Sequence, residues 1–340
     1  MLGNAGAIVV LRIEPLRVVD GGHAHAPCKD LVEEPASFYT DRFTRTRGTA
    51  AMNITVLGIG MMGLPMAQRL REAGLAVTAW NRTVEKAMRL AAHGARVAHT
   101  AAQAVRDADV VITMLENGDA VEAVLFGQGV AQVLKPGTLV IDMSSIKPAQ
   151  ARDHARRLAE RGCAHLDAPV SGGTVGAEAG TLAIMVGGEA ADFTRAQPVF
   201  APLGRATHVG PHGAGQLAKL ANQMIVGITI GAVSEALLLA ARGGADMAQV
   251  REAIRGGFAE SRILEVHGQR MVERDFAKRA AMSVQLKDLH NALDTADALG
   301  FQAPITKLFA ELYADAVDHG LSEYDHSALF VELARRNGMK

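Results

Sequence analysis

The sequence has few cysteines, almost no net charge and no long run of purely apolar residues. Its 340 residues include only two cysteines, Cys28 and Cys163, which lie far apart. Two such cysteines support neither a disulfide framework nor a zinc site, and they are typical of a reducing compartment, so we expect a cytoplasmic protein. Lys and Arg (35) nearly balance Asp and Glu (36), which gives a net charge of −1. This balance predicts neither a nucleic-acid partner nor binding to an anionic membrane surface.

No apolar run in the sequence approaches the roughly 20 residues that cross a bilayer, so we expect no membrane-spanning segment. Hydrophobic residues make up 49% of the chain and charged residues 21%. This composition is typical of a globular protein with a large core, and the length is sufficient for two domains.

Residues 1–51 differ from the rest and are predicted to be a disordered N-terminal extension. Their one apolar stretch, residues 7–11, lacks the basic flank and cleavage site of a signal peptide. His23, His25 and Cys28 are close enough in sequence to ligate a metal, but such a group needs folded surroundings, and we predict no metal site. Met52 is a plausible native start, and removal of the extension is then expected to leave activity intact.

From residue 54 onward, short apolar runs alternate with helical stretches, and this alternation predicts βαβ units in a doubly wound parallel sheet. We therefore assign residues 52–212 to a Rossmann-type NAD(P)-binding α/β domain. The predicted strands are residues 54–58, 75–80, 110–114, 138–142, 165–168 and 182–186, and the predicted helices include 61–72 and 149–160.

After Gly215 the strand signals stop, and residues 213–340 are predicted to form an all-helical substrate and dimerisation domain. Residues 224–241 are apolar nearly all round, which indicates burial on several faces, either against a partner subunit or at the centre of the domain itself. The predicted helices are residues 216–242, 248–256, 283–299, 305–318 and 326–336.

A glycine-rich turn follows the first predicted strand and opens the first helix. It contains Gly58, Gly60 and Gly63 in the spacing of a dinucleotide-binding turn, with Met61 and Met62 between them. The first glycine permits the tight turn, the second lets the backbone approach a pyrophosphate, and the third allows close helix–strand packing. The helix N-terminus supplies free N–H groups for the phosphates. We predict that all five residues contact a nicotinamide dinucleotide.

The end of the second predicted strand indicates which dinucleotide is bound. Sites that prefer NAD carry Asp or Glu at this place, to bind the ribose hydroxyls. Here the residues are Asn81, Arg82 and Thr83, which can all donate to a 2′-phosphate. NADP(H) is therefore the predicted cofactor, with NAD(H) possible, although Arg82 could instead point to solvent.

A lysine on the otherwise apolar helix from residue 216 is the main candidate for chemistry. Lys219, Asn222 and Gln223 stand at i, i+3 and i+4, on one face near the start of the helix. A buried lysine needs a partner or a function, although a lysine that extends to the surface is the common alternative.

The chain from Met52 onward resembles the β-hydroxyacid dehydrogenase family, which includes 3-hydroxyisobutyrate dehydrogenases and tartronate semialdehyde (2-hydroxy-3-oxopropionate) reductases. Several segments, among them residues 141–146, 219–223 and 325–329, are most similar to the reductases. The 3-hydroxyisobutyrate enzymes usually have Asn-Asn where this chain has Asn222 and Gln223. The landmarks that carry the resemblance are the glycine turn, residues 167–173 (DAPVSGG), the helix start at residues 213–222, and residues 286–289 (LKDL).

The resemblance implies a helical domain of the 6-phosphogluconate dehydrogenase type and an NADP(H)-preferring reduction of a small carboxylate-bearing aldehyde, most specifically 2-hydroxy-3-oxopropionate to glycerate. Lys219 is then the general acid, and a lowered pKa through burial and a nearby cation such as Lys287 would suit it. Asn222 is expected to orient Lys219. The remaining contacts implied are Ser171, Gly172, Gly173 and Gln223 for the substrate, and Met114, Leu115, Ser145 and Lys287 for the cofactor.

Other activities are considered alongside this one. A 3-hydroxyisobutyrate dehydrogenase, a glyoxylate or succinic semialdehyde reductase and an imine reductase share the scaffold, and a noncatalytic NADP-binding scaffold is the alternative of another class. Asp325, His326 and Ser327 are contiguous and cannot form a catalytic triad. His154 and His290 are expected to face solvent or to cap helices. A homodimer or homotetramer is the expected assembly.

Overall fold

The structure is a computed structural model, and it describes residues 52–339. The expectations for residues 1–51, including the extension and the group of His23, His25 and Cys28, lie outside the described residues. The described part begins with a nine-stranded sheet and continues as a set of helices. The strands are β1 (Asn53–Leu57), β2 (Ala76–Trp80), β3 (Arg96–Val97), β4 (Val110–Thr113), β5 (Leu139–Asp142), β6 (Ala164–Asp167), β7 (Val170–Ser171), β8 (Leu182–Gly188) and β9 (Gly204–Gly210).

The sheet has the strand order β3-β2-β1-β4-β5-β6-β8-β7, with β9 paired to β8. The first six strands are parallel, whereas β6 and β7 pair with β8 in the antiparallel sense. The strand order reverses between β1 and β4. In open α/β sheets, ligands bind at such a reversal, outside the carboxyl ends of the strands. The predicted Rossmann domain is confirmed.

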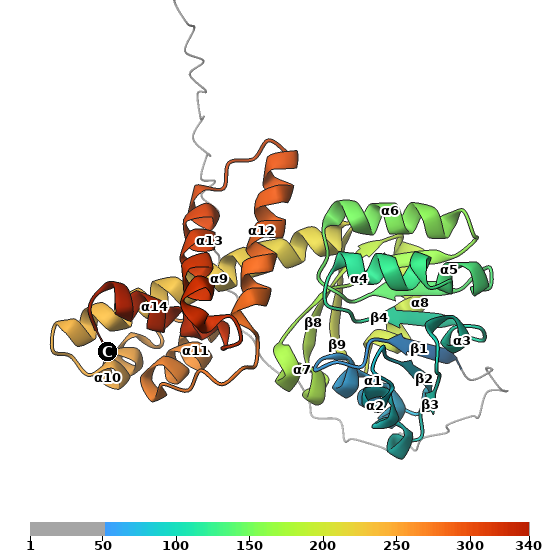
Figure 1. The fold of residues 1–340 in the computed structure, drawn as a ribbon, viewed down its shortest axis with the longest axis horizontal. Helices are drawn as coiled ribbons and strands as arrows, with labels where there is room; N and C mark the ends of the chain where they lie inside the picture. Colours follow the sequence, from blue (N-terminus) through green and yellow to red (C-terminus); the bar gives the residue numbers. More distant parts are fainter. Residues whose placement is uncertain (1–51, 340) are drawn as a thin grey trace, which may run out of the picture. The chain divides into compact units, whose positions relative to one another are not determined.

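Helices cover both faces of the sheet, and each face has its own apolar core (Figure 1). One core includes side chains of α1, α2, α7 and α8, and the other includes side chains of α3, α4, α5 and α6. These helices are α1 (Gly63–Glu72), α2 (Val84–Met88), α3 (Ala101–Ala104), α4 (Gly118–Glu122), α5 (Val130–Val133), α6 (Pro148–Ala159), α7 (Gly173–Ala179) and α8 (Ala190–Phe200).

The second half of the described chain is helical, as expected, and is organised around its first helix, α9 (Ala214–Arg242). This helix contacts β6–β9 with part of its length and all five later α-helices with the rest (Figure 1). The later helices are α10 (Met247–Ile254), α11 (Arg262–Glu273), α12 (Met282–Ala298), α13 (Pro304–Ala316) and α14 (Leu329–Arg336), with a 3₁₀ turn at His326–Ala328.

The expectation that no segment is long and apolar enough to cross a membrane is wrong for α9. An 18-residue window of this helix has a mean hydropathy of 2.0, and in the described part of the chain it is the one helix that meets the criterion of length and composition. That is weak evidence for a membrane span, because the core helix of a soluble protein meets the same criterion. Here α9 is the central helix of its own domain, yet Ile225 and Leu239 on it remain 66% and 73% exposed.

Four elements of the structure were not predicted from the sequence, namely α11 (Arg262–Glu273) and the strands β3, β7 and β9. One expectation about a side chain is wrong. His154, which was expected at the surface or at a cap, is buried, and its Nε2 lies 3.2 Å from Glu122 Oε2. The reason is that α6 turns this side chain toward the sheet, one turn away from the apolar positions Ala151 and Leu158. His290 is exposed, as expected.

Candidate active site

The glycine turn between β1 and α1 is held by close backbone contacts. Gly58 has a φ of +107°, and its N–H donates to Trp80 O at 2.9 Å. A Cβ on Gly58 would lie 2.3 Å from Met114 O, and one on Gly63 would lie 1.9 Å from Gly58 O. At Gly60, by contrast, no atom lies within 4 Å of the Cβ position. Two of the three glycines therefore build the turn, and the middle one faces open space.

The start of α1 fits a dinucleotide phosphate. Met62 at the cap position provides no side-chain hydrogen bond to the helix, and no acidic residue stands in its first turn. The N–H groups and the positive end of the helix dipole are thus available to an anion. Met61 is 58% exposed beside the turn. Together with the open space at Gly60, these features match a pyrophosphate that lies against the turn.

Of the three residues that follow β2, the first holds the glycine turn in place and the other two are exposed to solvent. Asn81 Oδ1 accepts from Ile59 N at 3.0 Å, and Asn81 Nδ2 donates to Thr83 O at 2.9 Å. Asn81 therefore ties the glycine turn to the end of β2. Arg82 and Thr83 are exposed, and among residues 52–339 Arg82 has no hydrogen bond or ion pair. A free guanidinium at this position is available to a phosphate.

The loops after β4 and β5 form the next wall of the site. Met114 and Leu115 are half-buried, and Leu115 N donates to the Ser144 hydroxyl at 2.9 Å. Ser145, the next residue, donates from its hydroxyl to Asp288 Oδ1 at 3.0 Å. The end of β5 is therefore connected both to β4 and to the helical domain.

The start of α9 is fixed to the sheet by a buried carboxylate and a buried amide. Asp167 accepts from Gly213 N at 2.7 Å through Oδ1 and from Gln216 N at 2.9 Å through Oδ2. Gln216 accepts from Ile146 N at 3.1 Å and donates to Ser144 O at 2.8 Å. Asp167 satisfies N–H groups that a helix start leaves without partners. The first turns of α9 are consequently held against the ends of β5 and β6.

Lys219 lies in the second turn of this anchored helix and is 9% exposed. Its Nζ donates to Gln223 Oε1 at 2.9 Å. Burial lowers the pKa of Lys219 to about 8; the negative charge of Asp288 opposes this shift and the positive charge of Lys287 adds to it. A lysine in this state exchanges a proton readily near neutral pH.

The direct partner of Lys219 is Gln223 rather than Asn222. Asn222 is half-buried, and its Nδ2 donates to the same Gln223 Oε1 at 2.9 Å. Gln223 is four residues after Lys219, nearly above it on the same face of the helix, whereas Asn222 is three residues after it and has a shorter side chain. The Gln223 amide therefore reaches the lysine amine. The contact expected between Asn222 and Lys219 is therefore not present in the described structure: Gln223 contacts the lysine directly, and Asn222 shares the same Gln223 oxygen.

Lys287 lies on α12 and reaches the loops that follow β4 and β5. Its Nζ lies 3.2 Å from Ser145 O and 3.4 Å from Glu116 O, and also 3.0 Å from Asp288 Oδ1. Asp288 is buried, and its Oδ2 accepts from Gln223 Nε2 at 2.8 Å. Asp288 therefore joins Ser145, Lys287 and Gln223, and the sequence reading did not single it out. Its position next to Lys287 in the LKDL segment was the signal available.

The predicted substrate turn follows β7, one of the strands that α9 contacts. Ser171 ends β7. Gly172 and Gly173 have φ values of +136° and +63° and are exposed, while Ser171 is half-buried. Their backbone N–H groups and the Ser171 hydroxyl remain candidates for binding a carboxylate.

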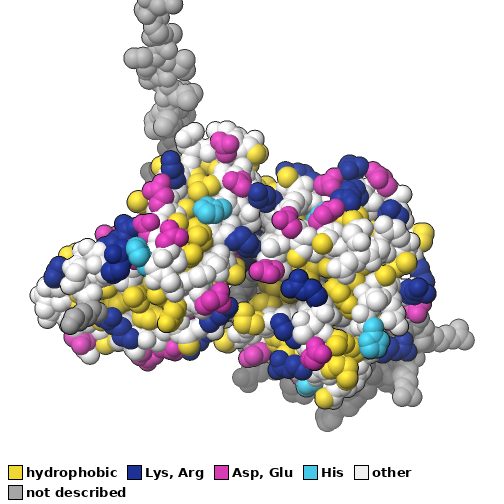
Figure 2. All heavy atoms as spheres, viewed as in Figure 1, with side chains coloured by type: hydrophobic (Ala, Val, Ile, Leu, Met, Phe, Trp, Pro, Cys, Tyr) yellow, Lys and Arg dark blue, Asp and Glu magenta, His cyan; other side chains and the backbone are white. Residues whose placement is uncertain are grey.

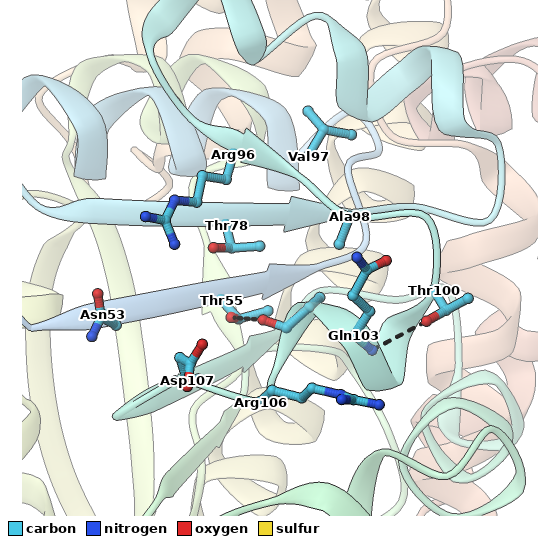
Figure 3. Close-up of a pocket in the computed structure, with 12 residues that line it drawn as sticks. Asn53, Thr55, Thr78, Arg96, Val97, Ala98, Thr100, Gln103, Arg106 and Asp107 are labelled. Carbon is cyan, nitrogen blue, oxygen red and sulfur yellow. Dashed lines mark hydrogen bonds between the residues drawn. The ribbon is translucent and has the colours of Figure 1, made fainter.

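A cavity of about 590 Å³ lies elsewhere, beside the first half of β1 and the strands β2 and β3 (Figure 3). Figure 3 shows the Arg96 and Arg106 side chains extending in opposite directions, so they do not converge on one ligand. Thr55 in its wall donates to Ala104 O at 2.7 Å. The glycine turn follows the opposite end of β1, and this cavity is separate from the cofactor-binding end of the sheet.

One group of side chains in the helical domain has the composition of a metal site. The candidate ligand atoms of His267, Asp325 and His326 lie within 4.8 Å of one another. However, Asp325 already accepts from Arg270 Nη1 at 3.1 Å, from Ser327 Oγ and from two backbone N–H groups. A guanidinium in contact with the carboxylate repels a cation, so this group is a structural network rather than a metal site.

The fold and these contacts define a class of protein. A Rossmann sheet with a glycine turn at its strand reversal, together with a buried lysine on a helix anchored to the ends of β5 and β6, is the arrangement of a nicotinamide-dependent oxidoreductase. Comparison with known proteins agrees. Residues 53–210 match the NAD-binding domain of 6-phosphogluconate dehydrogenase, and residues 213–333 match the NAD-binding domain of NADP-dependent 3-hydroxyisobutyrate dehydrogenase.

The chain belongs to the 3-hydroxyisobutyrate dehydrogenase-like family of β-hydroxyacid dehydrogenases. It is 45% identical to 2-hydroxy-3-oxopropionate reductase of Escherichia coli (strain K12) over 282 residues, which cover 82% of this chain and 96% of that protein. It is 36% identical to the NAD-dependent L-serine dehydrogenase of Pseudomonas aeruginosa over 285 residues, 81% of this chain and 96% of that one. The structure of Mycobacterium tuberculosis 3-hydroxyisobutyrate dehydrogenase with L-serine has a TM-score of 0.78 and 35% identity, and covers 84% of this chain and 99% of its own. The chain is an NAD(P)-dependent oxidoreductase that acts on CH–OH groups.

Proposed function

We propose that this enzyme reduces a small carboxylate-bearing aldehyde, most specifically 2-hydroxy-3-oxopropionate to glycerate, and that Lys219 is its general acid. The observation that carries the proposal is the buried Lys219, with its lowered pKa and its hydrogen bond to Gln223, on the helix end that faces Ser145 and Asp288. The 45% identity to the Escherichia coli 2-hydroxy-3-oxopropionate reductase supports this substrate over the others of the family.

The chemistry follows from what these residues can donate. The bound nicotinamide supplies the hydride for reduction of an aldehyde carbon. Lys219, as an ammonium, donates a proton to the oxygen of the former aldehyde as negative charge develops on it. The Ser171 hydroxyl and the N–H groups of Gly172 and Gly173 bind the substrate carboxylate, which fixes the aldehyde in one orientation.

The test of the acid role is Lys219→Ala, with Lys307→Ala as its control because Lys307 is an exposed lysine on α13. We expect Lys219→Ala to bind NADPH as the wild type does and to lose several orders of magnitude in kcat. Lys307→Ala is expected to keep full turnover. Near-normal turnover of Lys219→Ala would refute the general-acid role.

We propose NADP(H) as the preferred cofactor, with NAD(H) also accepted, because the exposed Arg82 and Thr83 side chains can donate to a 2′-phosphate and no carboxylate stands in their place. Arg82→Asp is expected to move the preference toward NAD(H), because a carboxylate repels the phosphate and binds ribose hydroxyls. Arg89→Asp, an exposed arginine next to the end of α2, is the matched control. Unchanged discrimination between the two cofactors in Arg82→Asp would rule out this assignment.

A substrate panel separates the proposed activity from its alternatives. NADPH oxidation is measured with 2-hydroxy-3-oxopropionate, glyoxylate, succinic semialdehyde and methylmalonate semialdehyde, and with a cyclic imine. The highest kcat/KM is expected for the first compound. A higher value for methylmalonate semialdehyde would favour a 3-hydroxyisobutyrate dehydrogenase, and silence on every compound would favour a noncatalytic NADP-binding scaffold.

We also propose a cytoplasmic homodimer or homotetramer. The exposed apolar side chains Ile225 and Leu239 on α9 support an assembly, because large apolar side chains on one helix face are typical of subunit contacts. Size-exclusion chromatography with light scattering measures the mass, and Ile225→Glu is expected to lower it. A wild type that elutes as a monomer contradicts this part of the proposal.

A further inference from the structure

The Gln223 side chain has all of its hydrogen-bonding positions occupied, and its two ends face different kinds of group. Its oxygen accepts from Lys219 Nζ and from Asn222 Nδ2, both at 2.9 Å. Its nitrogen donates to Asp288 Oδ2 at 2.8 Å and to Gln285 Oε1 at 3.3 Å. An amide has two acceptor positions and two donor hydrogens, so this set is complete. A flipped amide would turn donors toward donors and an oxygen toward a carboxylate.

Gln285, on α12, contacts Gln223 of α9 through two hydrogen bonds. Gln285 is 1% exposed on α12, and its Nε2 donates to the Gln223 backbone carbonyl at 2.9 Å. Its own oxygen accepts from the Gln223 side chain. The two glutamines thus form a reciprocal pair, in which Gln285 contacts both the main chain and the side chain of Gln223. This pair connects α12 to the turn of α9 that carries Lys219.

His326 stands behind Gln285. Its Nδ1 lies 3.4 Å from Gln285 Oε1, and because that oxygen is an acceptor, the favourable tautomer carries the hydrogen on Nδ1. Burial lowers the pKa of His326 to about 3, with His267, Arg270 and Lys219 also lowering it and Asp325 opposing them. The ring is therefore neutral at physiological pH and offers one donor and one acceptor.

The charged and titratable groups that face this network come from three directions. Lys219 lies on α9, and Lys287 and Asp288 lie on α12. The third group is the network of His267, Arg270 and Asp325, which packs the ring of His326 edge-on against that of His267 at a centroid distance of 4.7 Å. None of these contacts gives Gln285 Oε1 a donor other than Gln223 and His326 among the described residues.

We propose that Gln285 and His326 are positioning residues for the reaction, and that they act by holding the Gln223 amide with its oxygen against the Lys219 amine. The inference rests on the proposed function, because it assigns these residues to the general acid. An oxygen held in contact with Nζ keeps the lysine in place and stabilises its ammonium form, which is the form that donates the proton. Gln285 and His326 contact neither substrate nor cofactor in this scheme.

The first variants remove each contact without adding charge. Gln285→Met keeps the length of the side chain and loses its donors and acceptor, and His326→Leu loses the ring. Both are expected to lower kcat about fivefold to tenfold with little change in KM, which is the loss of about one hydrogen bond. His326→Asn retains a donor at the place of Nδ1 and is expected to restore most of the rate. Gln269→Met on α11 and His290→Leu on α12, both outside the network, are the matched controls.

A double-mutant cycle tests whether the two residues form one chain. If His326 acts through Gln285, the variant with both Gln285→Met and His326→Leu is no slower than Gln285→Met alone. If the two effects multiply, His326 does not act through Gln285 and the proposed chain is wrong. Circular dichroism and thermal unfolding identify any variant that is not folded, and His326→Asn then provides the comparison.

The pKa of Lys219 gives a measurement that is independent of turnover. It is followed by NMR of protein labelled with ¹³C at the lysine side chains, with Lys219→Met to assign the signal. We expect Gln285→Met and His326→Leu to lower this pKa relative to wild type, and His326→Asn and the two controls to leave it unchanged. An unchanged pKa and pH profile in Gln285→Met and His326→Leu would overturn the positioning role. An active Lys219→Ala would instead contradict the general-acid role and leave the pKa test of the network in force.

Discussion

The glycine turn allows steric and cofactor-binding roles to be separated by two single substitutions. In Gly63→Ala the new Cβ would lie 1.9 Å from Gly58 O, whereas real Cβ atoms essentially never approach other atoms within 3.0 Å. The obstacle is backbone, so the turn itself must open by about 1 Å. Overpacking of this kind costs about 1–3 kcal/mol of folding free energy. For a protein of this size we expect a fall in Tm of about 2–5 °C.

Gly60→Ala is the matched change in the same turn. No atom lies within 4 Å of its Cβ position, and Gly60 is not among the glycines with positive φ. The stability of the protein without cofactor should therefore stay within about 0.5 kcal/mol of wild type. The methyl group instead occupies the space that a pyrophosphate needs. Loss of one charge-assisted hydrogen bond to a phosphate lowers cofactor affinity at least about tenfold.

Two measurements give the result. Urea unfolding without cofactor measures the free energy of unfolding, and NADPH fluorescence titration measures the Kd. The expected pattern is a destabilised Gly63→Ala and a stable Gly60→Ala that binds NADPH weakly. If Gly60→Ala binds NADPH with the wild-type Kd, the phosphates do not lie against this turn. If Gly63→Ala is as stable as wild type, the turn is not sterically closed.

Three further predictions concern pH and packing. The pKa of Lys219 is about 8, so kcat for reduction should fall about tenfold per pH unit above that value, whereas kcat for oxidation of the hydroxyacid should rise with pH to a plateau. Stopped-flow measurements from pH 6 to about 10 give both rates, and a flat profile contradicts the assignment. Arg335 and Arg336 donate to the Glu332 carboxylate in α14 and hold its pKa at about 2. The contribution of this carboxylate to the free energy of unfolding is therefore full above about pH 4.5 and is lost as the pH falls toward 2. The urea midpoints of wild type and Glu332→Gln should converge as the pH is lowered, and midpoints that keep a constant difference would contradict this contribution. A Cβ in Gly215→Ala would lie 2.4 Å from backbone carbonyls of β6 and β8, so this variant should lose both stability and kcat through displacement of α9, and a fully active, stable protein would show that α9 tolerates the shift.

The sequence indicated the fold where apolar periodicity was strong. The parallel strands β1, β4 and β5 are almost entirely buried, and their mainly apolar runs are visible in one dimension. β9 was missed because its residues, GRATHVG, alternate between half-buried and exposed at the sheet edge. α11 was missed although Ser261 caps it and Leu264, Gly268 and Met271 are buried at helical spacing, so a signal was present there.

Some residues of the site could likewise be predicted from the sequence, and others could not. Lys219, Ser145 and Lys287 were found because each stands in a motif with an unusual residue type, and the structure brings them to one place. Asp288 and Gln285 were not found, because their importance lies in contacts between α12 and α9 over more than 60 residues of sequence. The balanced charge of the sequence is also seen on the surface. Figure 2 shows acidic and basic side chains interspersed on the face in view.

The continuity of α9 has a mechanical consequence. Its 29 residues span about 44 Å without a proline, from the carboxylate that caps its first turn to the far end of the helical domain. The helix that carries the proton donor is therefore fixed directly to the ends of β5 and β6. The contacts of Ser145 with Asp288 and of Lys287 with the β4 and β5 loops join α12 to the sheet and, because Asp288 also accepts from Gln223, to α9 as well. The sheet, α9 and α12 therefore share one set of hydrogen bonds around the lysine, and a shift of any one of them changes the surroundings of the proton donor.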